Sequence, residues 1–290
     1  MCSSSQVHEE PFTYSFHELR LSGWGCRRCG IIFLHPQPTA DELKQLYSAE
    51  YFTGGDFRCG HENGYCDPAT LERVADPALL VQIKTMKGTG RFLEIGCAGG
   101  AFLDAARKLG FDVQGVELSD EACRIAMKTF GLRVFEGNVE DARFPDESFD
   151  VVFMGDVLEH LPNPITTLRE IYRILDKEGM LVMALPCQTN TIFSRIGFLV
   201  YGALRQSATV ALPPYHLFEY RPGSLRFLLR SCGFRVVRLD QGIIPPNMIN
   251  LRGPAIQRIG KKIFQYPNWA FTRLFGVLGD RITVFGSAQK

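Results

Sequence analysis

Apolar residues along the chain follow two recurring patterns: short continuous runs, and longer stretches in which they return every three or four positions. The first pattern is typical of buried strands, and the second of helices that pack one face against a core. Strands are predicted at 92–95, 113–117, 132–135, 149–154, 179–185, 234–239 and 281–285, and helices at 101–109, 120–130, 164–175 and 224–231. This alternation predicts an α/β fold with a parallel sheet covered on both faces.

The first predicted strand leads into a glycine-rich turn. Gly96 and Gly100 flank the point where the strand passes to the helix 101–109. Glycine lets a backbone approach a ligand without a Cβ in the way, and the N–H groups at a helix start favour an electron-rich partner. Glu117 follows Gly96 by 21 positions, about the distance at which a two-strand nucleotide site places an acid against ribose hydroxyls. A dinucleotide site would need glycine at 98 and 101, where the chain has alanine, so that cofactor is less favoured.

The turn resembles the first motif of class I S-adenosylmethionine-dependent methyltransferases, an acid, one residue and then Gly-x-Gly-x-Gly. Glu94, Gly96 and Gly100 match it, and Ala98 replaces the middle glycine. A second resemblance covers 136–164, with a polar residue after the third strand, then Phe-Pro-x-x-Ser-Phe-Asp and Val-Leu-Glu-His-Leu. Together these matches imply a three-layer αβα Rossmann-like fold with a seven-stranded sheet whose last strand is antiparallel.

The resemblance also implies S-adenosyl-L-methionine as the cofactor. In that reading Glu117 binds the ribose, Val139 presents its backbone N–H to adenine, and Asn138 replaces the acid that accepts from the exocyclic amine. An asparagine carbonyl can still accept that hydrogen bond. The full implied set of cofactor-binding residues is Glu94, Gly96, Cys97, Ala98, Gly100, Glu117, Leu118, Asn138, Val139 and Asp156.

Two histidines are candidates for the proton transfer that methylation of a hydroxyl needs, because imidazole titrates near neutral pH. His160 follows the fourth strand, at the end where open α/β sheets bind ligands. His216 stands in a proline-rich segment that closes over the acceptor in related enzymes, so it is also a candidate substrate contact. The alternative for each is a histidine that serves only the fold.

The N-terminal part of the chain contains the pair Cys26-x-x-Cys29, which is half of a zinc ribbon. The other half is incomplete, because Cys2 is present but Ser5 stands where a second upstream cysteine would fall. No bound metal is therefore expected, and Cys26 and Cys29 are weak candidate ligands beside the alternative of two buried thiols.

After this pair the chain resembles a subset of these methyltransferases in which a helix folds over the cofactor mouth. That resemblance makes Tyr51 and Tyr65 candidates for lining the acceptor site, with packing between helix and core as the alternative. The residues that carry it are Pro36, Pro38, Thr39, Leu43, Leu46, Tyr47, Tyr51 and Phe52.

These patterns divide the chain into an N-terminal extension, 1–88, and a cofactor-binding domain, 89–290, with cap insertions at about 187–222 and 241–279. The net charge of +1 gives no reason to expect a nucleic acid partner. Both insertions, however, contain long stretches without Asp or Glu that mix basic with apolar residues. They predict a cap over a large apolar or anionic acceptor, peripheral contact with an anionic membrane, or a self-packed lid or dimer seam.

The nine cysteines are scattered, which does not indicate a disulfide framework, and no apolar run is long enough to span a membrane. We expect a cytoplasmic protein that methylates a hydroxyl of a prenylated quinone precursor, a natural product or a sugar. The alternatives are a binding or assembly protein that keeps this fold without turnover, and a nicotinamide-dependent oxidoreductase. The oligomeric state does not follow from the sequence.

Overall fold

The computed structural model describes residues 2, 4–16, 19–39, 41–43, 77–210, 216–246 and 255–290. Its centre is a seven-stranded sheet. In spatial order the strands are β11 (Phe234–Gly242), β12 (Arg281–Ala288), β8 (Leu175–Pro186), β7 (Phe149–Gly155), β4 (Arg91–Ile95), β5 (Asp112–Glu117) and β6 (Val134–Glu136). Strand β12 runs antiparallel to both of its neighbours, and the other pairs are parallel. The predicted sheet and its antiparallel last strand are confirmed.

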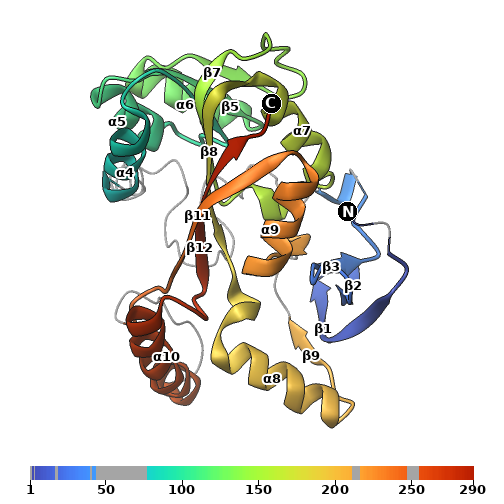
Figure 1. Cartoon of the computed structure of the whole chain (residues 1–290). Helices are drawn as coiled ribbons and strands as arrows, with labels where there is room; N and C mark the ends of the chain where they lie inside the picture. The colour runs from blue at the N-terminus through green and yellow to red at the C-terminus, as the bar shows by residue number, and fades with distance from the viewer. Residues whose placement is uncertain are drawn as a thin grey trace.

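Helices cover both faces of this sheet (Figure 1). On one face pack α4 (Pro77–Lys87), α5 (Ala101–Lys108) and α6 (Asp120–Phe130), and on the other α7 (Pro164–Ile174) and α9 (Pro222–Ser231). Each face of the sheet has its own hydrophobic core. Side chains alternate between the two faces along each strand, so the same strands contribute residues to both cores. In β4, Phe92 belongs to the core under α4 and α5, whereas Leu93 belongs to the core under α7 and α9.

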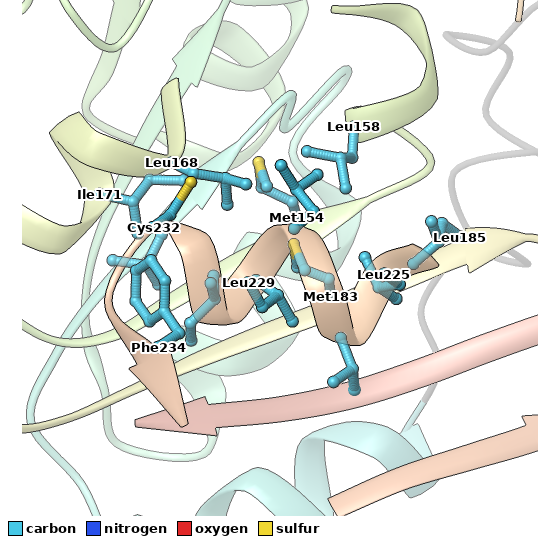
Figure 2. Packing of buried hydrophobic residues seen from close by; sticks show 14 of the residues in the cluster. Met154, Leu158, Leu168, Ile171, Met183, Leu185, Leu225, Leu229, Cys232 and Phe234 are labelled. Atoms are coloured by element: carbon cyan, nitrogen blue, oxygen red, sulfur yellow. The ribbon is translucent and has the colours of Figure 1, made fainter. Parts of the chain in front are cut away.

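The core under α7 and α9 is made of aliphatic, sulfur-containing and aromatic side chains, Phe234 among them, that pack between the sheet and the two helices (Figure 2). Met154 and Met183 rise from neighbouring strands toward Leu225 and Leu229 of α9. Full burial of such a side chain stabilises the fold by about 1.5–3 kcal/mol. This core fixes where β7 and β8 end, and therefore where the residues that follow them lie.

The helix ends agree with the sequence signals. Ser119 caps α6 by accepting a hydrogen bond from the N–H of Ala122, and Gly131 ends the helix with φ +65°. Asn163 caps α7, whose first residue is Pro164. Both caps satisfy N–H groups that a helix start leaves without a partner.

A second sheet of five strands lies beside α9, at the blue end of the chain in Figure 1. Its order is β10 (Phe218–Glu219), β3 (Ile32–His35), β2 (Leu19–Cys26), β1 (Val7–Phe16) and β9 (Ala208–Val210). Two of its strands come from the insertion that follows β8, so the N-terminal segment and this insertion form one structure. The sequence analysis did not predict this pairing. The division of the chain into an extension, 1–88, and a cofactor-binding domain, 89–290, stays a prediction.

Two further helices are inserted at the carboxyl edge of the main sheet. They are α8 (Ile192–Ala203), which follows β8, and α10 (Ala255–Phe275), which follows β11. Two 3-10 turns also follow strands at this edge, η1 (Leu158–His160) and η2 (Gln188–Asn190). The predicted helical insertions are thus present. Tyr51, Tyr65 and most of the predicted lid helix lie outside the described residues.

Within the described part of the chain, none of the helices combines the length and the apolar character needed to cross a membrane.

Candidate functional site

The turn after β4 has a backbone conformation that few residues adopt. Gly96, Ala98 and Gly100 have φ values of +73°, +46° and +84°. A Cβ on Gly96 would lie 2.4 Å from Val157 Cγ2, and one on Gly100 would lie 2.6 Å from Leu132 Cδ1. The two glycines are therefore required by both conformation and space. Ala98 carries a Cβ at a left-handed position, which explains why a glycine is usual there.

Glu117, the last residue of β5, holds this turn in place. Its Oε2 accepts a hydrogen bond from the backbone N–H of Ala98 at 2.8 Å, and its Oε1 accepts one from Ser119 at 2.9 Å. The side chain is buried, and this burial raises the pKa of Glu117 although the backbone N–H groups oppose the rise. Since an ionised carboxylate has about four acceptor positions, lone pairs remain for ribose hydroxyls.

Glu94 lies beneath the same turn with an acceptor that has no partner. Its carboxyl group is buried, and Oε2 makes no hydrogen bond within the described part of the chain. Burial, and then the charge of Glu117, raise the pKa of Glu94 well above its ordinary value. Two carboxyl groups that face each other without a counter-charge form a place where a cation is stabilised.

The other predicted cofactor contacts present different groups to the turn. Leu118 follows Glu117 and is 65% exposed, an unusual apolar surface next to a buried carboxylate. Asn138 donates from Nδ2 to Asp141 Oδ2 at 3.1 Å, which aims the amide and leaves its carbonyl oxygen as an acceptor. Val139 and Cys97 are buried, so only their backbone faces the turn.

These features fit S-adenosylmethionine. The orphaned acceptor of Glu94 suits the cationic amino-acid end of the cofactor, and Glu117 suits the ribose. The exposed face of Leu118 suits a purine ring. Gly100 is the N-cap of α5 and has no side chain to accept from the first N–H groups of that helix, so a ligand could accept from them. The roles of individual residues stay predictions.

A second cluster lies where β7 ends. The rings of His160 and His216 meet edge to face with centroids 4.9 Å apart. Glu159 Oε1 lies 3.6 Å from His160 Nε2, and His216 Nδ1 lies 3.5 Å from Glu219 Oε1. The structure thus brings together the two histidines that were predicted separately. Ligand atoms of Glu159, His160 and His216 all lie within 4.8 Å of one another, a spacing that could also hold a divalent cation.

Glu159 is the member of this cluster that the sequence analysis did not single out. Its side chain is 1% exposed, and neither carboxylate oxygen makes a hydrogen bond within the described residues. Burial raises the pKa of Glu159 to about 8, the charge of Asp156 adds to the rise, and His216 opposes it. Burial lowers the pKa of His216, but Glu219 and Glu159 outweigh this, and the net pKa is raised. The acidic and basic groups of the cluster therefore influence each other's protonation.

Two aspartates, one at each end of β7, have different partners. Asp156, at φ +53°, follows the strand and accepts a hydrogen bond from Arg281 Nη2 at 2.6 Å, so the predicted cofactor contact faces β12 and the histidine cluster. Asp150, at the opposite end of β7, accepts three hydrogen bonds from Arg91, one from the backbone N–H and two from the guanidinium. These bonds join the starts of β4 and β7, so Asp150 serves the fold.

A cavity of about 400 Å³ opens beyond the cluster, at the edge where β8 and β11 end. Arg195 and Arg221 line it together with Asn190, Ser224 and Gln241. Arg195 donates to the backbone and side-chain oxygens of Asn190, whereas Arg221 Nε is buried without a hydrogen bond inside the described ranges. Burial, and then the charge of Arg195, lower the pKa of Arg221. Two cations that repel each other in a cavity favour an anionic occupant.

Comparison with known proteins agrees with this geometry. Residues 93–183 match the family described as methyltransferase domain. The chain is 37% identical over 94 residues to the ubiquinone biosynthesis O-methyltransferase of Albidiferax ferrireducens and 28% identical over 161 residues to that of an Azoarcus species. These matches cover 30% and 52% of this chain but only 37% and 66% of the two relatives, which is less than two thirds of either.

The fold also occurs in solved structures. A SAM-dependent methyltransferase from Archaeoglobus fulgidus superposes with a TM-score of 0.51 at 20% sequence identity, covering 75% of this chain and 94% of that one. At this identity the likeness concerns the fold alone. The chain carries a class I S-adenosylmethionine-dependent methyltransferase domain, and the cofactor of this class is S-adenosylmethionine. Within the class, its curated relatives include O-methyltransferases of ubiquinone biosynthesis.

Proposed function

We propose that the protein transfers a methyl group from S-adenosylmethionine to a hydroxyl group of a small-molecule acceptor. The observation that carries this proposal is the paired arrangement at one sheet edge: the strained glycine turn held by Glu117, and the histidine cluster that follows the neighbouring strand β7. The first half binds a nucleoside, and the second can take a proton.

The cofactor supplies an activated methyl group on a sulfonium. The protein then has to hold the acceptor oxygen in line with that methyl at near-contact distance, since positioning accounts for much of the barrier reduction in such reactions. The acceptor oxygen would take the methyl group as its bond to sulfur breaks, leaving a neutral thioether, and the hydroxyl would then have to give up its proton. His216 or His160 accepts it in the neutral imidazole form, and Glu159 stabilises the resulting imidazolium.

The acceptor class follows from two lines of support. The relatives are named for ubiquinone biosynthesis, which favours a prenylated quinone precursor, with natural products and sugars as the wider set. The cavity with Arg195 and Arg221 favours an acceptor that carries a carboxylate or phosphate. An acceptor with a hydroxyl and an anionic group satisfies both.

Peripheral contact with an anionic membrane stays a second, weaker prediction. It is supported by exposed apolar side chains on the two inserted helices, including Leu199 of α8 at 73% and Leu274 of α10 at 77% exposure. Flotation with vesicles that contain an anionic lipid, compared with neutral vesicles, tests it. If the protein floats with neither kind of vesicle, the prediction of membrane contact is wrong.

The test of the proposed function has two stages. Calorimetry with S-adenosylhomocysteine should show stoichiometric binding to the folded protein. A panel of hydroxylated acceptors, with carboxylated phenols and nucleotide sugars among them, should then yield S-adenosylhomocysteine and a product heavier by one methylene. Binding of the cofactor without transfer to any acceptor would favour the rival, a protein that keeps the methyltransferase fold for binding or assembly.

A further inference from the structure

Three cysteine sulfurs meet in the N-terminal sheet, away from the cofactor turn. The Sγ atoms of Cys2, Cys26 and Cys29 all lie within 4.8 Å of one another, and those of Cys2 and Cys26 are 3.5 Å apart. Cys26 ends β2, and Cys29 lies in the tight turn that leads to β3. The sequence analysis counted Cys2 as part of an incomplete second half of a zinc ribbon, but nothing in the spacing shows that the chain start returns to this turn.

The backbone explains why the three residues converge. The N–H of Arg27 donates to the carbonyl of Gln6 at 2.9 Å, which draws the start of the chain against the turn. Within the turn, the N–H of Gly30 donates to the carbonyl of Cys26 at 2.9 Å, and Gly30 has φ +71°. This left-handed residue lets the chain reverse so that Cys29 faces Cys26.

The spacing of the sulfurs suits a shared metal ion better than a covalent bond. Tetrahedral zinc with Zn–S bonds of about 2.3 Å places its sulfurs about 3.8 Å apart. The observed 3.5 Å between Cys2 and Cys26 is close to that value, whereas a disulfide requires about 2.05 Å. A disulfide would also use two sulfurs and leave the third buried beside it.

We propose that Cys2, Cys26 and Cys29 bind one zinc ion as thiolates, with a fourth, non-cysteine ligand completing the tetrahedron. Up to three thiol protons leave as the ion binds, so the three-thiolate site with Zn²⁺ has a net charge of −1. The guanidinium groups of Arg27 and Arg28 follow Cys26 directly and offset this charge.

The position of this site gives it a structural role near the acceptor. Cys26, Cys29 and Ile31 belong to the same core as Met154, Leu185 and Tyr220, so the turn packs against the main sheet. Cys29 and Gly30 also line the cavity that contains Arg195 and Arg221. A bound ion would fix this wall of the cavity and the β3 strand, which pairs with β10 next to His216.

The experiment measures metal on the full chain purified with a reductant that does not bind zinc, and it does not depend on methyl transfer. Mass spectrometry of the metal should find about one zinc per chain, and competition with a colorimetric chelator should give the affinity. Cys2→Ser, at a residue that is only partly buried at the margin of the core, should weaken binding by roughly tenfold or more. Cys232→Ser, a buried thiol at the end of α9, is the control and should keep the zinc content of the wild type.

Cobalt binding by the wild-type chain provides a second measurement, which does not depend on any variant folding correctly. Co²⁺ added to the zinc-free wild-type chain should give thiolate-to-cobalt charge transfer and the visible bands of a tetrahedral ion, and Cys26→Ser should remove roughly a third or more of the charge-transfer intensity. The proposal is overturned if the reduced wild type takes up neither ion. It is also overturned if Cys2→Ser and Cys26→Ser bind zinc as the wild type does, or if the chain purified without reductant carries a disulfide between two of the three cysteines in place of metal.

Discussion

The carboxylate of Glu117 accepts a hydrogen bond from the backbone N–H of Ala98, 2.8 Å away, so the end of β5 holds the turn that follows β4. This acidic side chain fixes the strained turn. We propose that its remaining lone pairs also bind the ribose.

We predict that Glu117→Gln weakens binding of S-adenosylhomocysteine by roughly 10- to 100-fold, because hydrogen bonds to a charged group contribute about 1.5–3 kcal/mol. Calorimetry measures the change. Glu121→Gln, on the exposed side of α6, is the matched control and should bind as the wild type does. Equal affinity of Glu117→Gln and wild type, with both folded, would remove Glu117 from the site.

At the turn, Ala98→Gly should raise thermal stability or leave it unchanged, since a left-handed conformation costs a residue with a Cβ about 1–2 kcal/mol. Part of this gain is lost to the greater freedom of glycine in the unfolded chain. Cofactor affinity should stay equal or increase.

Gly96→Ala should have the opposite effect and lower stability by at least about 1–2 kcal/mol, because its Cβ would also meet Val157. A stable Gly96→Ala variant would contradict the described backbone.

For the histidine cluster, we predict that methyl transfer rises with pH through a midpoint above 6.5, because His216 acts as a base only when neutral and its pKa is raised. His216→Gln should lose this dependence and lower kcat by roughly 100-fold or more. NMR titration of the ring protons measures the pKa of His216 without any methyl acceptor present.

His216 should also make stability depend on pH. Since the folded-state pKa is raised, the stabilisation from protonated His216 is complete below about pH 6.5 and is lost as the pH rises through the folded-state pKa. A midpoint below 6.5 would disprove the assignment.

The cavity makes a separate prediction about anions. Inorganic pyrophosphate or a carboxylated phenol should raise the melting temperature of the wild type, and Arg221→Gln should weaken this binding by roughly tenfold, the effect of one lost charged hydrogen bond. Arg230→Gln, at the exposed end of the same helix α9, is the control. If no anion binds, the acceptor is not anionic, while the proposal of methyl transfer stands.

Asp150 should affect stability alone. Asp150→Asn is expected to lower the free energy of unfolding at pH 7 by about 1–2 kcal/mol, since the ion pair with Arg91 is only partly shielded from water. The pKa of Asp150 is lowered by hydrogen bonds from Arg91, so this contribution is present above about pH 3.8 and is lost as the pH falls through the folded-state value. Urea unfolding at several pH values measures it. Cofactor affinity should not change.

The sequence predicted those parts of the fold that depend on local patterns. The strands β7 and β8 were found because parallel strands buried on both faces are largely continuous apolar runs. Glu117 was placed at the turn from its distance along the chain, and the structure brings it there.

The parts that were not predicted depend on contacts between distant segments. Strands β9 and β10 are three and two residues long, too short to show a period. Arg281 pairs with Asp156 from the far end of the chain. Glu159 could have been noticed, because it precedes His160 directly, but its burial without a hydrogen bond among the described residues has no sequence signal.

The pairing of Phe33 with Phe218 has a consequence for biosynthesis. The ribosome releases β1, β2 and β3 first, yet the two outer strands of this small sheet, β9 and β10, follow only after β4 to β8 of the main sheet have been translated. During that interval β1 and β3 expose unpaired backbone groups, which are prone to associate with other nascent chains. Slow elongation or a shortage of chaperones should therefore reduce the yield of folded protein more than the stability of the finished molecule would suggest.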